Sequence, residues 1–414
     1  MTARFDLVVI GAGPAGVAAA LEVASRGLRV AVLDEQQRPG GQIFRRPPAE
    51  FAASWEAPVG YPWAERLLRS AEESPGIEWF PGSTVYGLFR ASPAESEGES
   101  GGAADLVTVA AARAGRTLRL DARRVLIATG AYDLPVPLPG GTLPGVFMAG
   151  AVQGFLKSQK LRVADRLVLA GSHPLLFIVA DQLRAAGADV VELAFARGLP
   201  SLREAVAALA AIPGHTRLLA ELAGCVLRLV TSGTRIRTRT LVTAAEGDGG
   251  VERVRLARVD RSWRRRGGPE RVVAADALVL GFGFHPSTEL ARQFGCALRW
   301  DSPKGGWVVQ VDDRMATSVP GVFVAGEPTG VAGAEQSRAE GVIAGQSIAA
   351  ELGAQVTAAE RTAARRSRTA SARFARVVQR LFEPSREGLL ALADSETTVC
   401  RCERVTRGTI ERFL

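Results

Sequence analysis

Apolar and polar positions follow a strand–helix–strand order that occurs twice along the chain. The first copy begins with an apolar run from Leu7 to Ile10, continues with a helix-like apolar pattern from Val17 to Ala24, and ends in a second apolar run over residues 29–35. The same order recurs over residues 165–195. Short apolar runs joined by helix-length patterns are typical of parallel strands with crossover helices. The pattern therefore predicts an α/β protein with two Rossmann-like domains.

The turn after the first apolar run reads Gly-Ala-Gly-Pro-Ala-Gly over residues 11–16, which we name the first fingerprint loop. Gly11 permits the tight turn, Gly13 lets the backbone approach a pyrophosphate, and Gly16 lets the helix pack on the strand. The N-terminus of the following helix offers N–H groups and partial positive charge to the phosphates. An acid at the end of the second strand can accept from ribose hydroxyls, and Glu35 lies 24 residues after Gly11. The predicted dinucleotide-binding residues are Gly11, Gly13, Pro14, Ala15, Gly16, Asp34 and Glu35.

The corresponding turn of the second copy, residues 171–176, departs from this pattern, and we name it the second fingerprint loop. Gly171 is kept, but His173 stands at the second glycine position and Leu176 at the third. A side chain at the second position occupies the space that a pyrophosphate needs. Glu192, 21 residues after Gly171, could still meet a ribose, but one acid does not restore a phosphate site. We expect a domain that keeps its fold while its NAD(P)H function is weakened or lost, with His173 as a filler rather than a catalytic group.

Charge and cysteine content narrow the classes of function. The 414 residues carry a net charge of +8 from 48 arginines and three lysines, a bias more typical of a GC-rich genome than of a nucleic-acid-binding face. We see no run of 18 apolar residues and no signal-peptide pattern, so we expect a cytoplasmic protein without a transmembrane segment. Four cysteines do not make a disulfide framework, and none of their spacings suits a local redox disulfide.

Three further segments resemble motifs of the flavoprotein reductases that have two dinucleotide domains. In that family the loop matching "GGQI" at 40–43 lies along the flavin, and the turn matching "ATG" at 128–130 packs by the FAD. The late Gly-Asp of the family binds the ribityl–phosphate region, and here Glu327 replaces the usual Asp. The helix that follows would aim its first N–H groups at the flavin C2 carbonyl and stabilise the anionic reduced flavin. The resemblance implies FAD as the cofactor, bound also by Gly41, Gln42, Ala128, Thr129, Gly130, Gly326, Glu327, Ala334 and Glu335.

The same resemblance implies an architecture of two three-layer ββα domains of the glutathione and thioredoxin reductase type, with a short C-terminal helical and cysteine-containing tail. Residues 1–160 and 286–352 would form a discontinuous FAD domain, and 161–285 the NAD(P)-like domain. Residues 353–414 would form a helical connector that ends in a partial [2Fe–2S] segment. Residues 91–105, "ASPAESEGESGGAAD", are expected to be a polar loop between strands.

Nearly the whole chain resembles one subgroup, which includes opine oxidase A subunits, hydrogen cyanide synthase B subunits and α subunits of bacterial proline, hydroxyproline and opine dehydrogenases. The resemblance rests on residues 130–171, on 289–327 and on "VCRCERVT" at 399–406. In that subgroup a β subunit of the D-amino-acid-oxidase type, with its own FAD, oxidises the substrate, and electrons then pass through an iron–sulfur cluster. The resemblance implies an FAD-binding electron-transfer subunit whose partners are such a β subunit and a small [2Fe–2S] subunit. It would lie in the cytoplasm or, through its complex, at the inner membrane surface.

Two other functions stay open. One is a self-contained NAD(P)H-dependent flavin reductase. The other is a non-catalytic subunit whose first fingerprint loop holds an adenine nucleotide such as ATP. No residue stands out as catalytic.

Cys400 and Cys402 match the start of the small [2Fe–2S] domain that ends many members of the subgroup. Such clusters need four thiolates, and Cys225 and Cys296 are expected in or beside the middle domain. Truncation of the sequence, ligands from a partner and a vestigial site are three explanations, beside the alternative of two surface thiols without a metal. We expect the chain by itself to hold no stable cluster.

Overall fold

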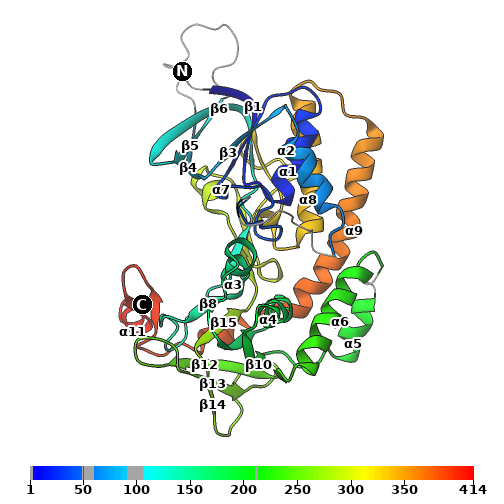
Figure 1. The fold of residues 1–414 in the computed structure, drawn as a ribbon. Coiled ribbons are helices and arrows are strands. Elements are labelled where there is room, and N and C mark those ends of the chain that lie inside the picture. Colours follow the sequence, from blue (N-terminus) through cyan, green and yellow to red (C-terminus); the bar gives the residue numbers. More distant parts are fainter. Residues whose placement is uncertain (1–2, 49, 51–59, 91–105, 210–212) are drawn as a thin grey trace. The chain divides into compact units, whose positions relative to one another are not determined.

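Two compact units make up the protein in the computed structural model (Figure 1). Unit 1 comprises residues 1–132 and 285–379, and unit 2 comprises residues 133–284 and 380–414. Each unit has its own sheet with a parallel Rossmann-like part, which confirms the predicted α/β class. The predicted polar loop at 91–105 lies outside the described residues. The structure describes residues 3–48, 50, 60–90, 106–209 and 213–414.

The sheet of unit 1 is built around β1, in which Leu7 to Ile10 are all buried. Parallel strands follow the order β3-β2-β1-β6, β19 runs parallel to the end of β6, and β5 and β4 extend the sheet in antiparallel fashion. β6, which is 12 residues long, pairs with strands of both the parallel and the antiparallel part of the sheet. The strands of unit 1 are β1 Ala3–Ile10, β2 Val30–Asp34, β3 Ile77–Pro81, β4 Ser83–Arg90, β5 Val107–Arg113, β6 Arg116–Ile127, β17 Leu298–Asp301, β18 Gly306–Val309 and β19 Val322–Val324.

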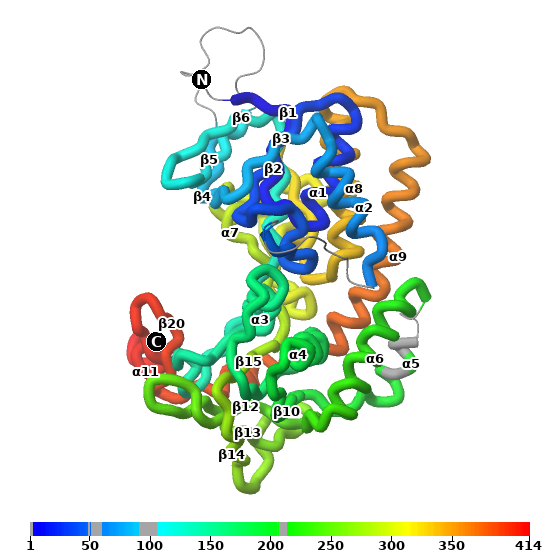
Figure 2. Tube along the Cα trace, viewed as in Figure 1, coloured from blue at the N-terminus to red at the C-terminus, as the bar shows by residue number. Residues whose placement is uncertain are grey.

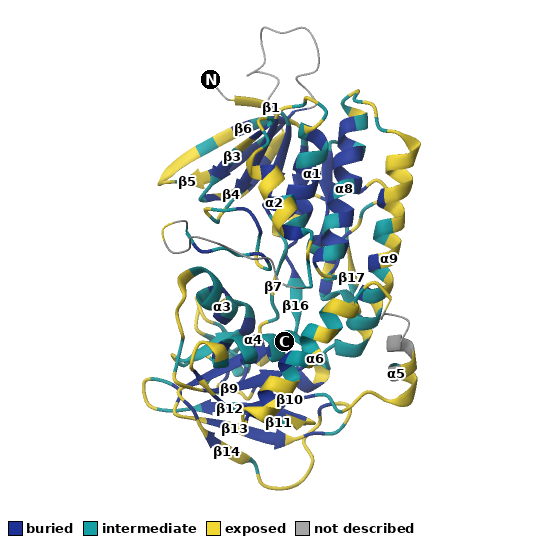
Figure 3. Ribbon diagram, turned by 45° about the vertical axis from the view of Figure 1, so that its right-hand side comes forward, coloured by how far each residue is buried: buried dark blue, intermediate teal, exposed yellow. Residues whose placement is uncertain are grey.

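Helices α1 and α8 share the core on one face of this sheet, and Figure 3 shows both largely buried. The tube in Figure 2 shows the late segment that contains α8 returning beside the N-terminal segment that contains α1. The two backbones approach closely because α8 has glycine at the contact: a Cβ at Gly341 would lie 2.1 Å from the Ala15 carbonyl oxygen. The helices of unit 1 are α1 Pro14–Ala24, α2 Ala64–Glu72, α7 Glu289–Gln293, the 3₁₀ turns Ser302–Lys304 and Glu327–Thr329, α8 Ala334–Glu351, and α9 Ala358–Phe382 as far as Gln379.

Unit 2 has a parallel sheet of order β11-β10-β9-β15-β8 and an antiparallel meander of β12, β13 and β14. The predicted boundary at residue 160 assigned β8 and α3 to the FAD domain, but β8 pairs with β15 in the sheet of unit 2. The strands are β8 Val146–Met148, β9 Arg166–Gly171, β10 Asp189–Phe195, β11 Arg235–Thr238, β12 Thr240–Glu246, β13 Arg253–Arg258, β14 Arg271–Ala274 and β15 Ala277–Gly281. The helices are α3 Ala149–Gly154 with a π-helical turn Phe155–Gln159, α4 Leu175–Ala185, α5 Leu202–Leu209 and α6 Thr216–Thr231.

The C-terminal segment of unit 2 contributes to the meander core. Leu389 and Leu392 are buried in the same cluster as residues of the meander strands. The segment contains α10 Arg386–Leu390, β20 Thr398–Cys400, β21 Val405–Thr406 and α11 Arg407–Glu411. Elsewhere, the chain passes between the units within two short strands, β7 Ala131–Asp133 and β16 Phe284–Pro286. Across the described part of the chain, no helix combines the length and apolar character needed to span a bilayer.

Candidate functional site

Three segments that are distant in sequence meet at one edge of the unit 1 sheet. β1, β6 and β19 are parallel neighbours, so their carboxyl ends lie together. The Ala128 N–H donates to the Ile10 carbonyl at 2.8 Å, and the Ala325 N–H donates to the Ile127 carbonyl at 3.2 Å. The first fingerprint loop, the 128–130 turn and the loop of residues 326–333, which we name the 326–333 loop, are thus brought together.

The three glycines of the first fingerprint loop have different roles. Gly11 has φ +104°, and a Cβ there would lie 2.3 Å from the Ala128 carbonyl oxygen. A Cβ at Gly16 would lie 1.9 Å from the Gly11 carbonyl oxygen. A Cβ at Gly13 would meet no atom closer than the Gly41 Cα at 3.9 Å, and the Gly13 backbone is extended. Gly11 and Gly16 are therefore required by the fold, whereas Gly13 leaves space that a ligand can use.

The start of α1 suits an anion. Pro14 is the first helical residue, Gly13 is its N-cap, and no side chain caps the helix. Ala15 packs towards the 326–333 loop, since a Cβ at Gly326 would lie 2.9 Å from the Ala15 Cβ. Backbone N–H groups at a helix start that lacks a side-chain cap are a favourable environment for a phosphate.

Two acids stand at the end of β2: Asp34 is its last residue, and Glu35 follows directly. Ile10 pairs with Leu33, so Asp34 is level with Gly11, and its carboxylate accepts from the Ala12 N–H at 2.6 Å and the Gln36 N–H at 2.7 Å. Burial raises the pKa of Asp34, while the two backbone hydrogen bonds oppose that rise. Glu35, the residue directly after β2, is exposed. Asp34 and Glu35 are both predicted to bind the cofactor, and at this strand end both remain predictions.

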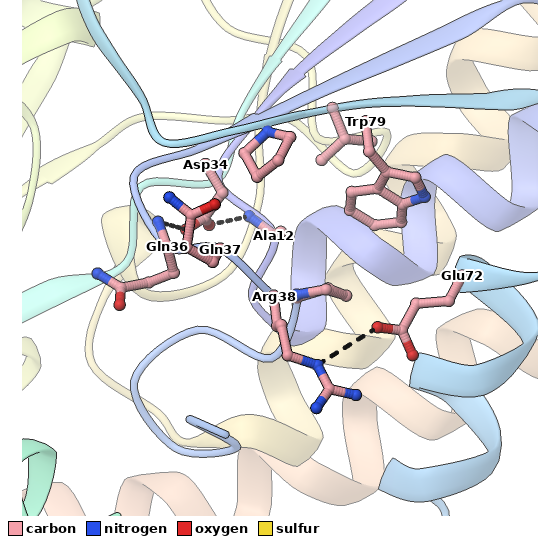
Figure 4. Close-up of a pocket in the computed structure, with 10 residues that line it drawn as sticks. Ala12, Asp34, Gln36, Gln37, Arg38, Glu72 and Trp79 are labelled. Carbon is pink, nitrogen blue, oxygen red and sulfur yellow. Dashed lines mark hydrogen bonds and ion pairs between the residues drawn. The ribbon is translucent and has the colours of Figure 1, made fainter. Parts of the chain in front are cut away.

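A pocket of about 150 Å³ lies beside Asp34 (Figure 4). Trp79 lines it from β3, where it is paired with Val32 of β2, and the Trp79 Nε1–H has no hydrogen-bond partner among the described residues. The sequence reasoning missed this pocket because β3 comes more than 40 residues after β2 along the chain. Its lining residues are Ala12, Val32, Asp34, Gln36, Gln37, Arg38, Pro39, Glu72, Trp79 and Pro81.

The "GGQI" segment lies on the first fingerprint loop. The Gly40 N–H donates to the Ala12 carbonyl at 2.8 Å. Gly41 has φ +60°, and a Cβ there would lie 2.9 Å from the Gly13 Cα, so this approach also requires glycine. Gln42, the next predicted residue, has an exposed side chain.

The 128–130 turn is fixed by hydrogen bonds within unit 1. The Thr129 hydroxyl donates to the Ser287 carbonyl at 2.9 Å, and the Ser287 N–H donates to the Gly130 carbonyl at 3.0 Å. Gly130 has φ +80°, and a Cβ added there would meet nothing within 4 Å, so its glycine serves the backbone conformation.

Glu327 caps the start of α8. Its carboxylate accepts from the Gly333 N–H at 2.8 Å and the Ala332 N–H at 3.3 Å, immediately before the Ala334 and Glu335 N–H groups that were predicted to face a flavin. Burial, with a smaller contribution from the nearby charge of Glu340, raises the pKa of Glu327 to about 6. The extra methylene relative to Asp gives a side chain that reaches its own helix start.

The side chain of Glu335 is held by an aromatic residue. It accepts from the Trp63 Nε1–H at 2.5 Å, and the Arg338 guanidinium lies over the Trp63 ring at 4.7 Å. Trp63 also packs edge-on against Phe44 and Tyr61, at centroid distances of 5.4 Å and 5.9 Å. This cluster fixes the first turn of α8, and no sequence motif pointed to it.

The second fingerprint loop keeps its turn but is filled by side chains. A Cβ at Gly171 would lie 2.0 Å from the Gly281 carbonyl oxygen, so the tight turn persists. The His173 ring packs on Phe284 at 5.0 Å and on Phe382 at 6.4 Å, and burial lowers the pKa of His173 to about 4. Leu176 is fully buried. A neutral histidine packed among aromatic rings supports the interpretation of His173 as a filler.

Glu192 is not at a ribose position. Gly171 pairs with Phe195, so Phe195 is the residue of the second domain that corresponds to Asp34. Glu192 lies three residues earlier with no exposed surface, 2.7 Å from Arg271 and 3.3 Å from Arg237. The proposal that Glu192 could meet a ribose is therefore wrong, because counting residues ignored the register of the strands.

The cysteine pair lies on a hairpin of β20 and β21. The Cys400 and Cys402 sulfur atoms are 3.6 Å apart, and Cys402 is exposed. The Glu403 backbone N–H, followed by the Cys402 side chain, lowers the pKa of Cys400. Cys225 and Cys296 are both buried. The described residues contain no group of three or more His, Cys, Asp and Glu side chains placed to hold a metal ion.

The fold and the first fingerprint loop define a two-domain protein of the dinucleotide-dependent oxidoreductase type. Residues 5–363 match the model of the pyridine nucleotide-disulphide oxidoreductase family, and the chain belongs to that family. It is 34% identical over 412 residues to the opine oxidase A subunit of Agrobacterium tumefaciens, covering 97% of this chain and 77% of that protein. It is 33% identical over 421 residues to hydrogen cyanide synthase subunit HcnB of Pseudomonas aeruginosa, covering 98% and 84%.

Solved structures agree on the fold. L-proline dehydrogenase of P. horikoshii superposes with a TM-score of 0.61 at 19% identity, over 89% of this chain and 60% of that one. Thioredoxin reductase of T. acidophilum superposes with a TM-score of 0.58 at 21% identity, over 84% of this chain and 99% of that one. The family model and the named relatives confirm the predicted subgroup, and membership of this family supports FAD binding.

Gly13→Val should remove dinucleotide binding without unfolding the protein, because the new methyl groups enter ligand space rather than packed backbone. The measurement is the flavin content of the purified variant together with its thermal midpoint. Gly16→Val is the contrasting variant, and we expect it to lower the yield of folded protein. Full flavin content in Gly13→Val would contradict this placement of the pyrophosphate.

Glu327 should make stability depend on pH. The folded pKa of about 6 lies above the ordinary value of 4.5, so the native state binds more protons than the unfolded state between these values. The free energy of unfolding should fall as pH rises through this window, by about 2 kcal/mol at most, and Glu327→Gln should lose that dependence. Thermal midpoints of both proteins without flavin, measured from pH 4 to 7, check this; parallel curves would show that Glu327 does not titrate there.

Proposed function

We propose that this chain is the FAD-binding electron-transfer subunit of a multi-subunit dehydrogenase or oxidase that acts on an amino acid, an opine or another amine. The observation that carries the proposal is the contrast between its two fingerprint loops. The first leaves ligand space at Gly13, with Asp34 beside it. The second is filled by His173 and its aromatic neighbours. One chain that keeps a flavin site while losing a nicotinamide site suits a subunit that receives electrons from a partner protein.

The residues at the first site fit FAD. Gly13 and the start of α1 would face the pyrophosphate, Asp34 would accept from the adenosine ribose, and Gly326 with Glu327 would face the ribityl–phosphate region. The Ala334 and Glu335 N–H groups at the start of α8 would stabilise negative charge at the flavin C2 carbonyl. Bound FAD would supply the capacity to accept electrons and pass them on. The residues of this chain bind and orient it.

The relatives favour a hetero-oligomer. They are named as subunits of opine oxidase and of hydrogen cyanide synthase. We infer a β subunit of the D-amino-acid-oxidase type, with its own FAD, that removes electrons from the C–N bond of the substrate. The complex would work in the cytoplasm or at the inner membrane surface, and substrate specificity would be a property of the β subunit.

Cys400 and Cys402 would provide two of the four thiolates of a [2Fe–2S] cluster, with the remaining ligands supplied from outside the 414 residues. Their sulfur atoms are on the same hairpin, 3.6 Å apart, and the Glu403 N–H stabilises the Cys400 thiolate. A cluster there would take electrons onward from the complex.

The visible spectrum of the purified chain tests the proposal. We expect flavin bands that NADH and NADPH do not bleach within seconds, and no turnover with a dye near the ordinary enzyme range of about 1 per second or more. Co-expression with a β subunit of the stated type should allow an amine substrate to bleach the bands. Rapid bleaching by NAD(P)H would favour a self-contained reductase, and a colourless chain that releases ATP on denaturation would favour an adenine-nucleotide-binding subunit.

Iron and acid-labile sulfide should be near zero in the isolated 414-residue chain, because two thiolates are half of a [2Fe–2S] ligand set. Elemental analysis and the visible spectrum of protein purified without oxygen provide the measurement, and Cys400→Ser is the matched control. Two irons per chain in the absence of other subunits, lost in Cys400→Ser, would require ligands that we have not identified.

A further inference from the structure

Helix α9 contacts the 326–333 loop from outside the part of the chain that matches the family model. The match ends at residue 363, six residues into α9. Three buried residues, Ala364, Ser371 and Ala375, form one stripe along the helix. The contacts that α9 makes beyond residue 363 therefore come from an element that follows the fold common to the family.

The 326–333 loop needs support from side chains. It connects β19 to α8 through one 3₁₀ turn. Gly326, Gly330 and Gly333 have φ values of +83°, +134° and +88°, a region that other residues rarely adopt. A segment with this many freely rotating positions has little intrinsic preference for one conformation.

Glu340 of α8 provides the direct anchor. Its side chain is 3% exposed, and Oε2 accepts from the Gly326 N–H at 3.0 Å and from the Thr329 hydroxyl at 2.8 Å. Both ends of the 3₁₀ turn are thus tied to one carboxylate. A buried carboxylate is a strong acceptor, and a nearby positive charge offsets the cost of its burial.

Helix α9 supplies that charge and a second contact. The Arg368 Nε lies 3.4 Å from Glu340 Oε1, which also accepts from the Gln336 amide at 2.8 Å. The Ser371 hydroxyl is 2.7 Å from Gln336 Oε1 and can donate to it, which orients that amide towards Glu340. Arg368 and Ser371 are one turn apart on α9 and converge on the same carboxylate.

A third contact from α9 reaches the loop itself. The Gln379 side-chain amide donates to the Val331 carbonyl. The helix therefore holds the loop at Val331 directly, and at Gly326 and Thr329 through Glu340.

We propose that Arg368 and Ser371 are positioning residues that set the affinity of the first site for FAD by holding the 326–333 loop through Gln336 and Glu340. The inference rests on the proposed function, since the loop is the part of the site assigned to the ribityl–phosphate region. Arg368 acts on the loop through Glu340, and Ser371 acts through Gln336 and Glu340. In this view α9 is part of the cofactor site and not only a connector to the cysteine pair.

The test compares Arg368→Ala and Ser371→Ala with Arg366→Ala, which removes an exposed arginine from the same helix. We expect the dissociation constant for FAD to rise about tenfold in Arg368→Ala, an effect of about 1.4 kcal/mol, and less in Ser371→Ala. Arg368→Lys should restore most of the affinity, because an ammonium keeps the compensating charge. Flavin titration, with thermal midpoints measured in parallel, provides these values.

Amide hydrogen exchange over residues 326–333 in flavin-free protein is the second readout. Faster exchange in Arg368→Ala than in Arg366→Ala is expected. If the wild-type chain binds FAD and the Arg368 and Arg366 variants bind it equally, the inference is overturned. If the wild-type chain binds no FAD, the proposed function fails, and the exchange rates alone then decide whether α9 holds the loop. Should Arg368→Ala not fold, Ser371→Ala carries the same comparison.

Discussion

Direct contact between backbone segments around the first fingerprint loop is the constraint on which unit 1 depends. There is no room for a Cβ at positions 11, 16 and 341. At each of them an added Cβ would lie 1.9 to 2.3 Å from a backbone carbonyl oxygen. These contacts press α1 against both the strand ends and α8. The direction of the α1 N-terminus, and with it the place for a phosphate, follows from that packing rather than from any polar side chain.

The two domains share one architecture but differ at their fingerprint loops. In the first, backbone surrounds a space that is lined by N–H groups and Asp34. In the second, the same turn is retained at Gly171, but aromatic rings take the ligand's place. The apolar burial of these rings stabilises the second domain without a ligand. Under the proposed function, such a domain would work as a scaffold, and the redox function would rest on the other domain and on partner subunits.

Local pattern was sufficient to predict both strand–helix–strand units, the first fingerprint loop and the degeneracy of the second. It failed wherever the role of a side chain depends on strand register or on contacts with distant segments. Glu192 was considered for a ribose because residue counts do not state which face of a strand a side chain occupies. Trp79 and Arg368 carried no local signal, since their roles arise only when segments far apart in sequence come together. Glycine spacing is a property of one loop and can be seen in sequence alone.

The free space beside Gly13 separates two properties that proteins usually lose together, the stability of the fold and the ability to bind a ligand. Its neighbours at positions 11 and 16 are constrained by the folded backbone itself, whereas the folded backbone leaves room for a Cβ at position 13. A chain that no longer needs to bind can therefore change position 13 while its turn still requires the first glycine. The second copy keeps Gly171 at that turn and has Leu176 at the position of Gly16. A dinucleotide domain can drift into a purely structural role through the position of Gly13 without passing through an unfolded ancestor. His173, at the equivalent position beside a preserved Gly171, is the outcome expected of such a history.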